Sequence, residues 1–137
     1  MKEKITVAVK VNAPVTKVWE YWNAPTHIVK WNAASDDWHT TKSTNDLQEG
    51  GTFTYRMEAK DGSVGFDAEG TYDKIITHNT IKYTMLDTRK VCLKFKEKGN
   101  TTEIIETFEA ETENPIELQK NGWQAILNNF KQYAESI

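Results

Sequence analysis

Cysteine is nearly absent from this sequence of 137 residues, which contains only Cys92. A single thiol cannot form an internal disulfide, and it is typical of a protein from a reducing compartment. No apolar run approaches the roughly 20 residues that a membrane-spanning helix needs. The segment that starts at Met1 passes directly into an alternating pattern without the apolar core of a signal peptide. We therefore expect a cytoplasmic protein without a membrane span.

Basic clusters and metal-ligand spacings are also missing. The net charge is −3 and no Lys/Arg cluster occurs, which argues against nucleic-acid binding. The three histidines, His27, His39 and His78, lie in separate regions, and Cys92 is remote from them in sequence. Gly50-Gly51 indicates a turn and not a phosphate-binding loop. We expect no metal site and no cofactor.

Aromatic residues, in contrast, are plentiful, with five each of Trp, Tyr and Phe. Many of them occur in segments in which apolar and polar residues alternate, the pattern of a half-buried strand. Turn signals such as Asp61-Gly62 and Gly99-Asn100 separate these segments. The strands are expected near residues 5–11, 39–47, 52–57, 64–72, 81–85, 91–96 and 101–110.

Helical spacing appears in two places. Val15 to Trp22 and Ile28 to Trp31 form two short patterns after the first strand, and a long apolar stripe runs from Trp123 to Ile137. Asn114 is expected to cap the long helix, with Pro115 at its first position and Glu117 as the acidic partner. Gly122 within this helix costs about 1 kcal/mol relative to Ala. Close packing of the helix on the sheet is the favoured explanation for it, and space for a ligand is the alternative.

These elements predict an α+β fold. A curved antiparallel sheet of about seven strands has one apolar face, two short helices follow its first strand, and a long C-terminal helix lies across the sheet. We find no linker or repeat, so residues 1–137 are expected to form a single domain.

Local motifs add a family resemblance. They are Ala13 to Trp19, Gly50 to Tyr55, Glu69 to Tyr72, Glu106 to Phe108 and Gly122 to Phe130. In this order they resemble the START-like (SRPBCC) superfamily with its helix-grip fold, and within it the family named for homologues of the activator of the 90-kDa heat-shock protein ATPase. The resemblance implies a cavity between sheet and helix that holds lipids or other apolar molecules. It supplies no universal catalytic residues.

The residues expected to face this space are mostly aromatic, and they could equally form a packed core. The alternative to a packed core is a ligand pocket, because a strongly curved sheet cannot easily close everywhere around a straight helix. Buried Tyr hydroxyls would then orient a ligand. The candidate ligand-binding residues are Trp31, Trp38, Phe53, Tyr55, Met57, Phe66, Tyr72, Tyr83, Met85, Glu106, Phe108, Trp123, Leu127 and Phe130. Trp31 and Trp38 are expected near the opening.

Two acidic sites need separate treatment. Asp36 and Asp37 lie close to His39, but no nucleophile accompanies them, so we interpret this loop as a rim of the cavity and assign no catalytic residue. Glu106 shares its strand parity with the more apolar residues of the last strand. It then faces the helix, unless the strand is shifted by one residue or the carboxylate pairs with Arg56 or Lys94. Inside an apolar cavity its pKa would rise above the ordinary value of about 4.3.

Three functions remain open on the sequence alone. The preferred one is the binding or carriage of a small apolar, lipid-like or aromatic molecule. The alternative is a protein-interaction or chaperone-associated module with a packed cavity, and the third is a cyclase- or hydrolase-type enzyme. The sequence does not determine the ligand, a protein partner or the oligomeric state.

Overall fold

A computed structural model describes residues 3–137 of the protein, so the first two residues of the expected domain lie outside the described part. It contains seven strands and three helices in the expected order. The elements are β1 (Lys4–Val11), α1 (Val15–Asn23), α2 (Pro25–Trp31), β2 (Trp38–Asn45), β3 (Thr52–Ala59), β4 (Gly65–Ile76), β5 (Thr80–Met85), β6 (Lys90–Lys98), β7 (Thr101–Glu109) and α3 (Ile116–Ser136).

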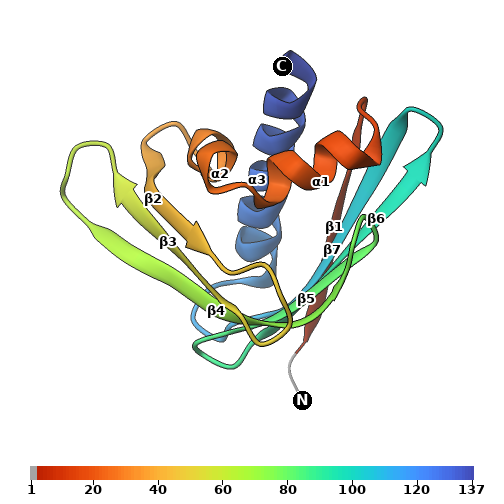
Figure 1. Ribbon diagram of the computed structural model, residues 1–137. Coiled ribbons are helices and arrows are strands. Elements are labelled where there is room, and N and C mark those ends of the chain that lie inside the picture. The colour runs from red at the N-terminus through yellow and green to blue at the C-terminus, as the bar shows by residue number, and fades with distance from the viewer. Residues whose placement is uncertain (1–2) are drawn as a thin grey trace.

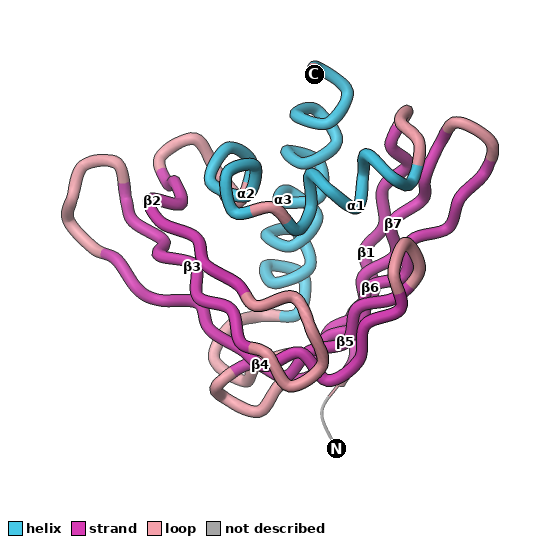
Figure 2. The backbone as a smooth tube through the Cα atoms, viewed as in Figure 1, coloured by secondary structure: helices cyan, strands magenta, loops and turns pink. Residues whose placement is uncertain are grey.

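All seven strands form one antiparallel sheet in the order β1-β7-β6-β5-β4-β3-β2. The sheet curls into a broad V, and α3 rises between the two arms of this V while α1 and α2 cross its open side (Figures 1 and 2). Register shifts occur between Thr40 and Lys42 and between Tyr72 and Lys74. Extra residues of this kind bend a strand and increase its twist, which helps the sheet to curl. The predicted α+β helix-grip architecture is confirmed.

The helix α3 covers the sheet unevenly. Its backbone runs close to β1 and approaches the opposite arm, β3 to β5, much less. On the closely packed side, Trp123 stacks on Phe108 with 3.9 Å between ring centroids. Leu127 and Phe130 of the same helix are fully buried. The backbone of α3 therefore leaves a wider space beside β3 to β5. A cavity can form there wherever side chains do not fill this space.

The start of α3 differs from the sequence prediction. The helix begins at Ile116, Pro115 occupies the capping position, and no side chain caps the helix. Asn114 instead donates its backbone N–H to a carboxylate oxygen of Glu111 (2.6 Å), and its carbonyl accepts from the Gln119 amide (2.8 Å). The predicted Asn114 cap is wrong because this turn is closed by Glu111 and Gln119.

Two further details of α3 also differ from expectation. Ile137 lies beyond the end of the helix and is exposed, so the apolar stripe ends before it. A Cβ atom added at Gly122 would meet no heavy atom within 4 Å. Close packing therefore does not explain this glycine.

Candidate functional site

A cavity of about 310 Å³ lies between the arm formed by β3 to β5 and the helices. Its walls are mainly aromatic and aliphatic, because the inward positions of these strands alternate with polar outward ones. The residues that line it are Trp22, Asn23, Trp31, Asn32, Phe53, Tyr55, Met57, Phe66, Ala68, Glu69, Tyr72, Ile81, Tyr83, Met85, Arg89, Leu93, Glu106, Trp123 and Ile126.

Three aromatic rings of the sheet form one wall around Phe53. Its ring lies 5.0 Å from Tyr55, 5.3 Å from Tyr72 and 5.0 Å from Tyr83, measured between centroids. Gly70 permits this arrangement, since a Cβ atom there would lie 2.6 Å from the Phe53 ring. The absence of a side chain at this position of β4 therefore makes room for the ring at the centre of the wall.

The tyrosine hydroxyls give this wall a polar side. Asn45 donates a hydrogen bond from its amide to the Tyr72 hydroxyl (3.3 Å) and another to the carbonyl of Asn23 (2.9 Å). Burial raises the pKa of Tyr55 well above its usual value, and the neighbouring Tyr72 raises it further. These phenols stay protonated at neutral pH and can donate hydrogen bonds.

Glu106 is the buried acid of the cavity. Only 4% of it is exposed, and β7 alternates strictly so that Ile104, Glu106 and Phe108 face inward. Among residues 3–137, no hydrogen bond or ion pair reaches its carboxyl group, and burial alone raises its pKa to about 8. Lys94 instead donates to the Thr80 hydroxyl (3.1 Å). The inward orientation, one of the alternatives open from sequence, is the one present.

Burial also raises the pKa of Tyr83 well above its usual value, and the nearby Glu106 adds to this. The two side chains therefore lie within electrostatic reach of each other. At neutral pH, a protonated Glu106 and a protonated Tyr83 present two neutral hydrogen-bond donors inside apolar walls.

Ten of the fourteen sequence-predicted residues line this cavity. Phe66 does so at the surface, since 53% of it is exposed. Phe108 and Leu127 belong to the packed core beside the cavity. Phe130 packs against the rings of Trp22 (4.9 Å) and Trp31 (5.0 Å).

The loop before β2 has a different place from the one expected. Ser35, Asp36 and His39 line a second, polar depression of about 560 Å³ next to the end of α3. Trp38 lies there too and approaches the aromatic cavity only through Phe66, at 5.9 Å between ring centroids. The loop therefore rims this depression and not the aromatic cavity.

Sequence reasoning missed several lining residues, of which Trp22 and Arg89 matter most. Trp22 is part of the helical spacing of α1, but the candidate lining residues come mainly from the strands and the C-terminal helix. Arg89 lies two residues before the inward-facing Val91, and this parity is the signal that could have found it. Its side chain is only 16% exposed.

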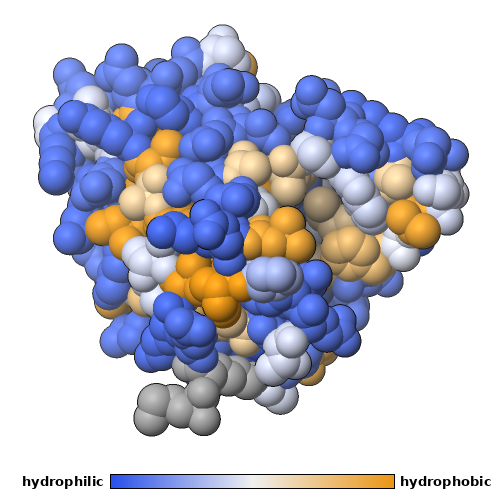
Figure 3. Space-filling model, turned by 180° about the vertical axis from the view of Figure 1, so that it is seen from behind, coloured by the Kyte–Doolittle hydropathy of each residue, from blue (hydrophilic) through white to orange (hydrophobic). Residues whose placement is uncertain are grey.

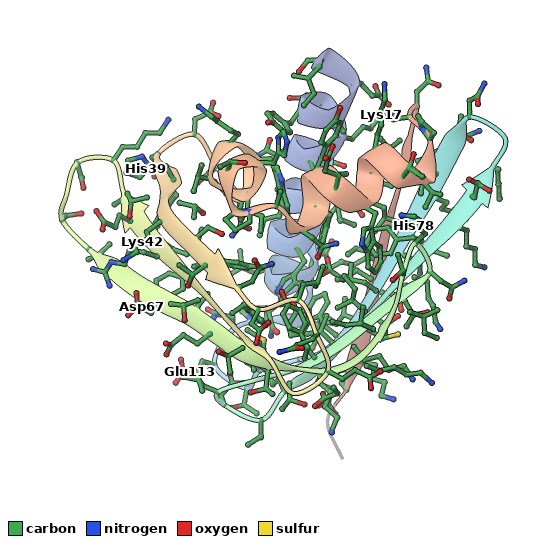
Figure 4. All side chains as sticks on the ribbon, viewed as in Figure 1. Lys17, His39, Lys42, Asp67, His78 and Glu113 are labelled. Atoms are coloured by element: carbon green, nitrogen blue, oxygen red, sulfur yellow. The ribbon has the colours of Figure 1, made fainter. Side chains whose placement is uncertain are left out.

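Within the described part of the chain, no group of three His, Cys, Asp or Glu side chains could hold a metal ion. His39, on β2, and His78, in the turn between β4 and β5, lie on opposite sides of the molecule (Figure 4). In residues 3–137, no helix is long and apolar enough to cross a bilayer.

Comparison with known proteins gives a family. The family model described as "Activator of Hsp90 ATPase homolog 1-like protein" matches residues 12–135. The chain belongs to this family. The resemblance found in the sequence is thus confirmed, whereas a comparison with curated proteins found no match.

Solved structures of similar proteins agree with this assignment. The AHSA1-like protein from Aeromonas hydrophila is 43% identical, with 98% of this chain and 93% of that chain covered and a TM-score of 0.92. A protein from Cytophaga hutchinsonii is 55% identical, with coverage of 97% and 92% and a TM-score of 0.84. A protein from Nitrosomonas europaea, 15% identical with coverage of 97% and 94%, shares the fold at a TM-score of 0.83.

Proposed function

We propose that this domain binds a small, mainly apolar molecule in its aromatic cavity. The observation that carries the proposal is a space of about 310 Å³ beside an otherwise packed core. Protein interiors contain few voids larger than a water molecule. Ligand pockets have volumes of roughly 300–1,000 Å³, so this cavity suits a small ligand.

The chemistry of the walls supports an apolar ligand with few polar groups. Rings and methionines such as Phe53, Met57 and Met85 supply contact area, and a few hydroxyl and carboxyl groups can orient a bound molecule. An empty cavity of this kind leaves its lining atoms without dispersion partners, and a ligand that fills it restores them.

The binding site can be tested by filling it. Ala68 lines the cavity from β4, whereas Thr71 on the same strand is exposed. In Ala68→Phe a ring should occupy the cavity and weaken binding of 1-octanol, measured by tryptophan fluorescence and calorimetry. Thr71→Phe adds the same ring outside and should leave binding unchanged. Native mass spectrometry of protein purified from its own host should reveal a bound small molecule.

The family description supplies a second candidate, since it names an activator of a chaperone ATPase. In that case the domain acts through a protein partner and the cavity is only imperfect packing. Hydrophobic residues do reach the surface, including Leu86 (72% exposed) and Leu118 (58% exposed). Seen from behind, hydrophobic residues lie among hydrophilic ones near the middle of the molecule (Figure 3). Absence of 1-octanol binding, together with recovery of a chaperone from a pull-down, would favour this candidate.

A further inference from the structure

The charged groups of the cavity carry information about its ligand, and the inference drawn from them rests on the proposed function. Three charged residues line the cavity: Glu69, Arg89 and Glu106. The carboxylate of Glu69 accepts a hydrogen bond from Thr54 (3.2 Å), its partner in the β3–β4 register. Because this pair alternates with the inward Phe53 and Gly70, it lies on the outer face. The two charged side chains directed inward are Glu106 and Arg89.

Arg89 is held in place by the turn between β5 and β6. Its Nε donates to Asp87 Oδ2 (2.7 Å), and its carbonyl accepts from the backbone N–H of Met85 (2.9 Å). In the described residues, neither Nη atom of Arg89 forms a hydrogen bond. A largely buried guanidinium thus retains N–H donors at one end of an apolar cavity, and guanidinium groups match carboxylates in geometry and charge.

The strand register gives the separation between the backbone positions of Arg89 and Glu106, which we call the two anchors. Glu106 pairs with Leu93 on β6, and Arg89 lies four residues before Leu93. At about 3.3 Å per residue, the two positions are about 13 Å apart along the sheet. Tyr83 pairs with Val91, which lies between these two positions. The charge of Glu106 raises the pKa of Tyr83 and the charge of Arg89 lowers it. Arg89 and Glu106 therefore lie apart along the cavity, with Tyr83 between them and mainly aromatic and aliphatic walls around them.

We infer that the ligand of this cavity is a monocarboxylic acid with an apolar middle and a second, uncharged oxygen. Arg89 binds the carboxylate at one end, and Glu106 donates a hydrogen bond to the hydroxyl or carbonyl oxygen at the other. Because burial raises the pKa of Glu106 to about 8, its carboxyl group carries the required proton at neutral pH.

The charge of Arg89 favours a carboxylate over an amine or a phosphate at its end of the cavity. An amine at the Arg89 end would meet a like charge. A phosphate would bring up to two negative charges to one guanidinium that Asp87 already partly neutralises. A carboxylate brings one charge and a planar pair of oxygens, which a guanidinium can bind with two parallel hydrogen bonds.

The test compares three probes of equal chain length: 8-hydroxyoctanoic acid, octanoic acid and 1-octanol. Binding to the wild-type protein is measured by calorimetry at pH 7 and located by chemical-shift changes of the tryptophan indole groups. We expect 8-hydroxyoctanoate to bind most tightly. Loss of its hydroxyl should weaken binding about fivefold, as one neutral hydrogen bond predicts. Replacement of its carboxyl group by a methyl group, as in 1-octanol, should weaken it at least about tenfold.

Variants assign these effects to the two anchors. Arg89→Gln should weaken binding of both acids at least about tenfold and leave 1-octanol within about twofold. Lys90→Gln removes an equal charge from the adjacent, exposed position and should change nothing. Glu106→Leu should abolish the preference for the hydroxy acid, and Glu106→Gln, which retains an N–H donor, should restore it.

Two results would overturn the inference, and they differ in meaning. If 1-octanol binds in the cavity as tightly as the acids, or if Arg89→Gln leaves acid binding intact, the proposed function stands and the ligand class is wrong. If no probe binds and no indole signal shifts, the proposed function fails and the ligand class fails with it. The comparison of the three probes on wild-type protein tests the inferred ligand class even if a variant does not fold.

Discussion

Replacement of Glu106 by glutamine should stabilise the protein at neutral pH and remove part of its pH dependence. The change keeps the size of the side chain and removes its ability to ionise. In the folded state, burial raises the Glu106 pKa from 4.5 to about 8. An ionised carboxylate would be costly there, since no cation lies against it among residues 3–137 and Tyr83 beside it stays neutral.

The direction of this pH dependence follows from how many protons the folded and unfolded states bind. Between pH 4.5 and 8 the folded protein keeps the Glu106 proton while the unfolded chain loses it, so stability falls as pH rises. Each pH unit in this window costs about 1.4 kcal/mol. Between pH 5 and pH 7 the wild type should therefore lose about 2–3 kcal/mol relative to Glu106→Gln. This is a large part of the roughly 5–15 kcal/mol that stabilises an ordinary domain.

Urea unfolding at pH 5, 6, 7 and 8, followed by tryptophan fluorescence, measures this difference. The contributions of the other carboxyl groups to the free energy of unfolding cancel when the two proteins are compared at the same pH. Glu103→Gln, at an outward position of the same strand, is the matched control and should follow the wild type within about 0.5 kcal/mol. Wild-type and Glu106→Gln curves that stay parallel from pH 5 to 8, or a carboxyl NMR titration with a midpoint near 4.5, would refute the reasoning.

Packing and glycine positions give four further predictions. Phe130→Ala should lower the free energy of unfolding by about 3–5 kcal/mol in urea denaturation, since this ring is fully buried; a loss below ~1 kcal/mol would contradict its place in the core. Trp123→Ala should cost less, because Trp123 is half-buried and forms a cavity wall, and equal losses for the two variants would contradict this. Gly122→Ala should raise the free energy of unfolding by about 0.5–1 kcal/mol, because the new methyl group meets open space within a helix. Gly70→Ala should do the opposite and shift the melting temperature down, since its methyl group would collide with Phe53.

The sequence by itself determined the elements and the faces of its strands. A period of two residues is built into an extended chain, so β7 reveals from its pattern alone that Glu106 lies on the same side as Ile104 and Phe108. The apolar stripe around Leu127 and Phe130 likewise fixes which side of α3 meets the sheet. These are local properties, and the neighbours of a residue in the chain are enough to specify them.

Which inward residues pack and which surround a cavity was decided only by the tertiary structure. Phe108 and Phe53 look alike in sequence, yet one stacks on Trp123 in the core and the other stands in the cavity wall. The difference arises because α3 runs close to β1 and away from β3 to β5, which depends on how strongly the whole sheet curls. The pairing of β6 with β7 likewise brings Arg89 to the cavity that contains Glu106, although the two residues are 17 positions apart in sequence. No local pattern encodes the distance between two arms of a sheet, because that distance is the sum of twists and bulges along all seven strands.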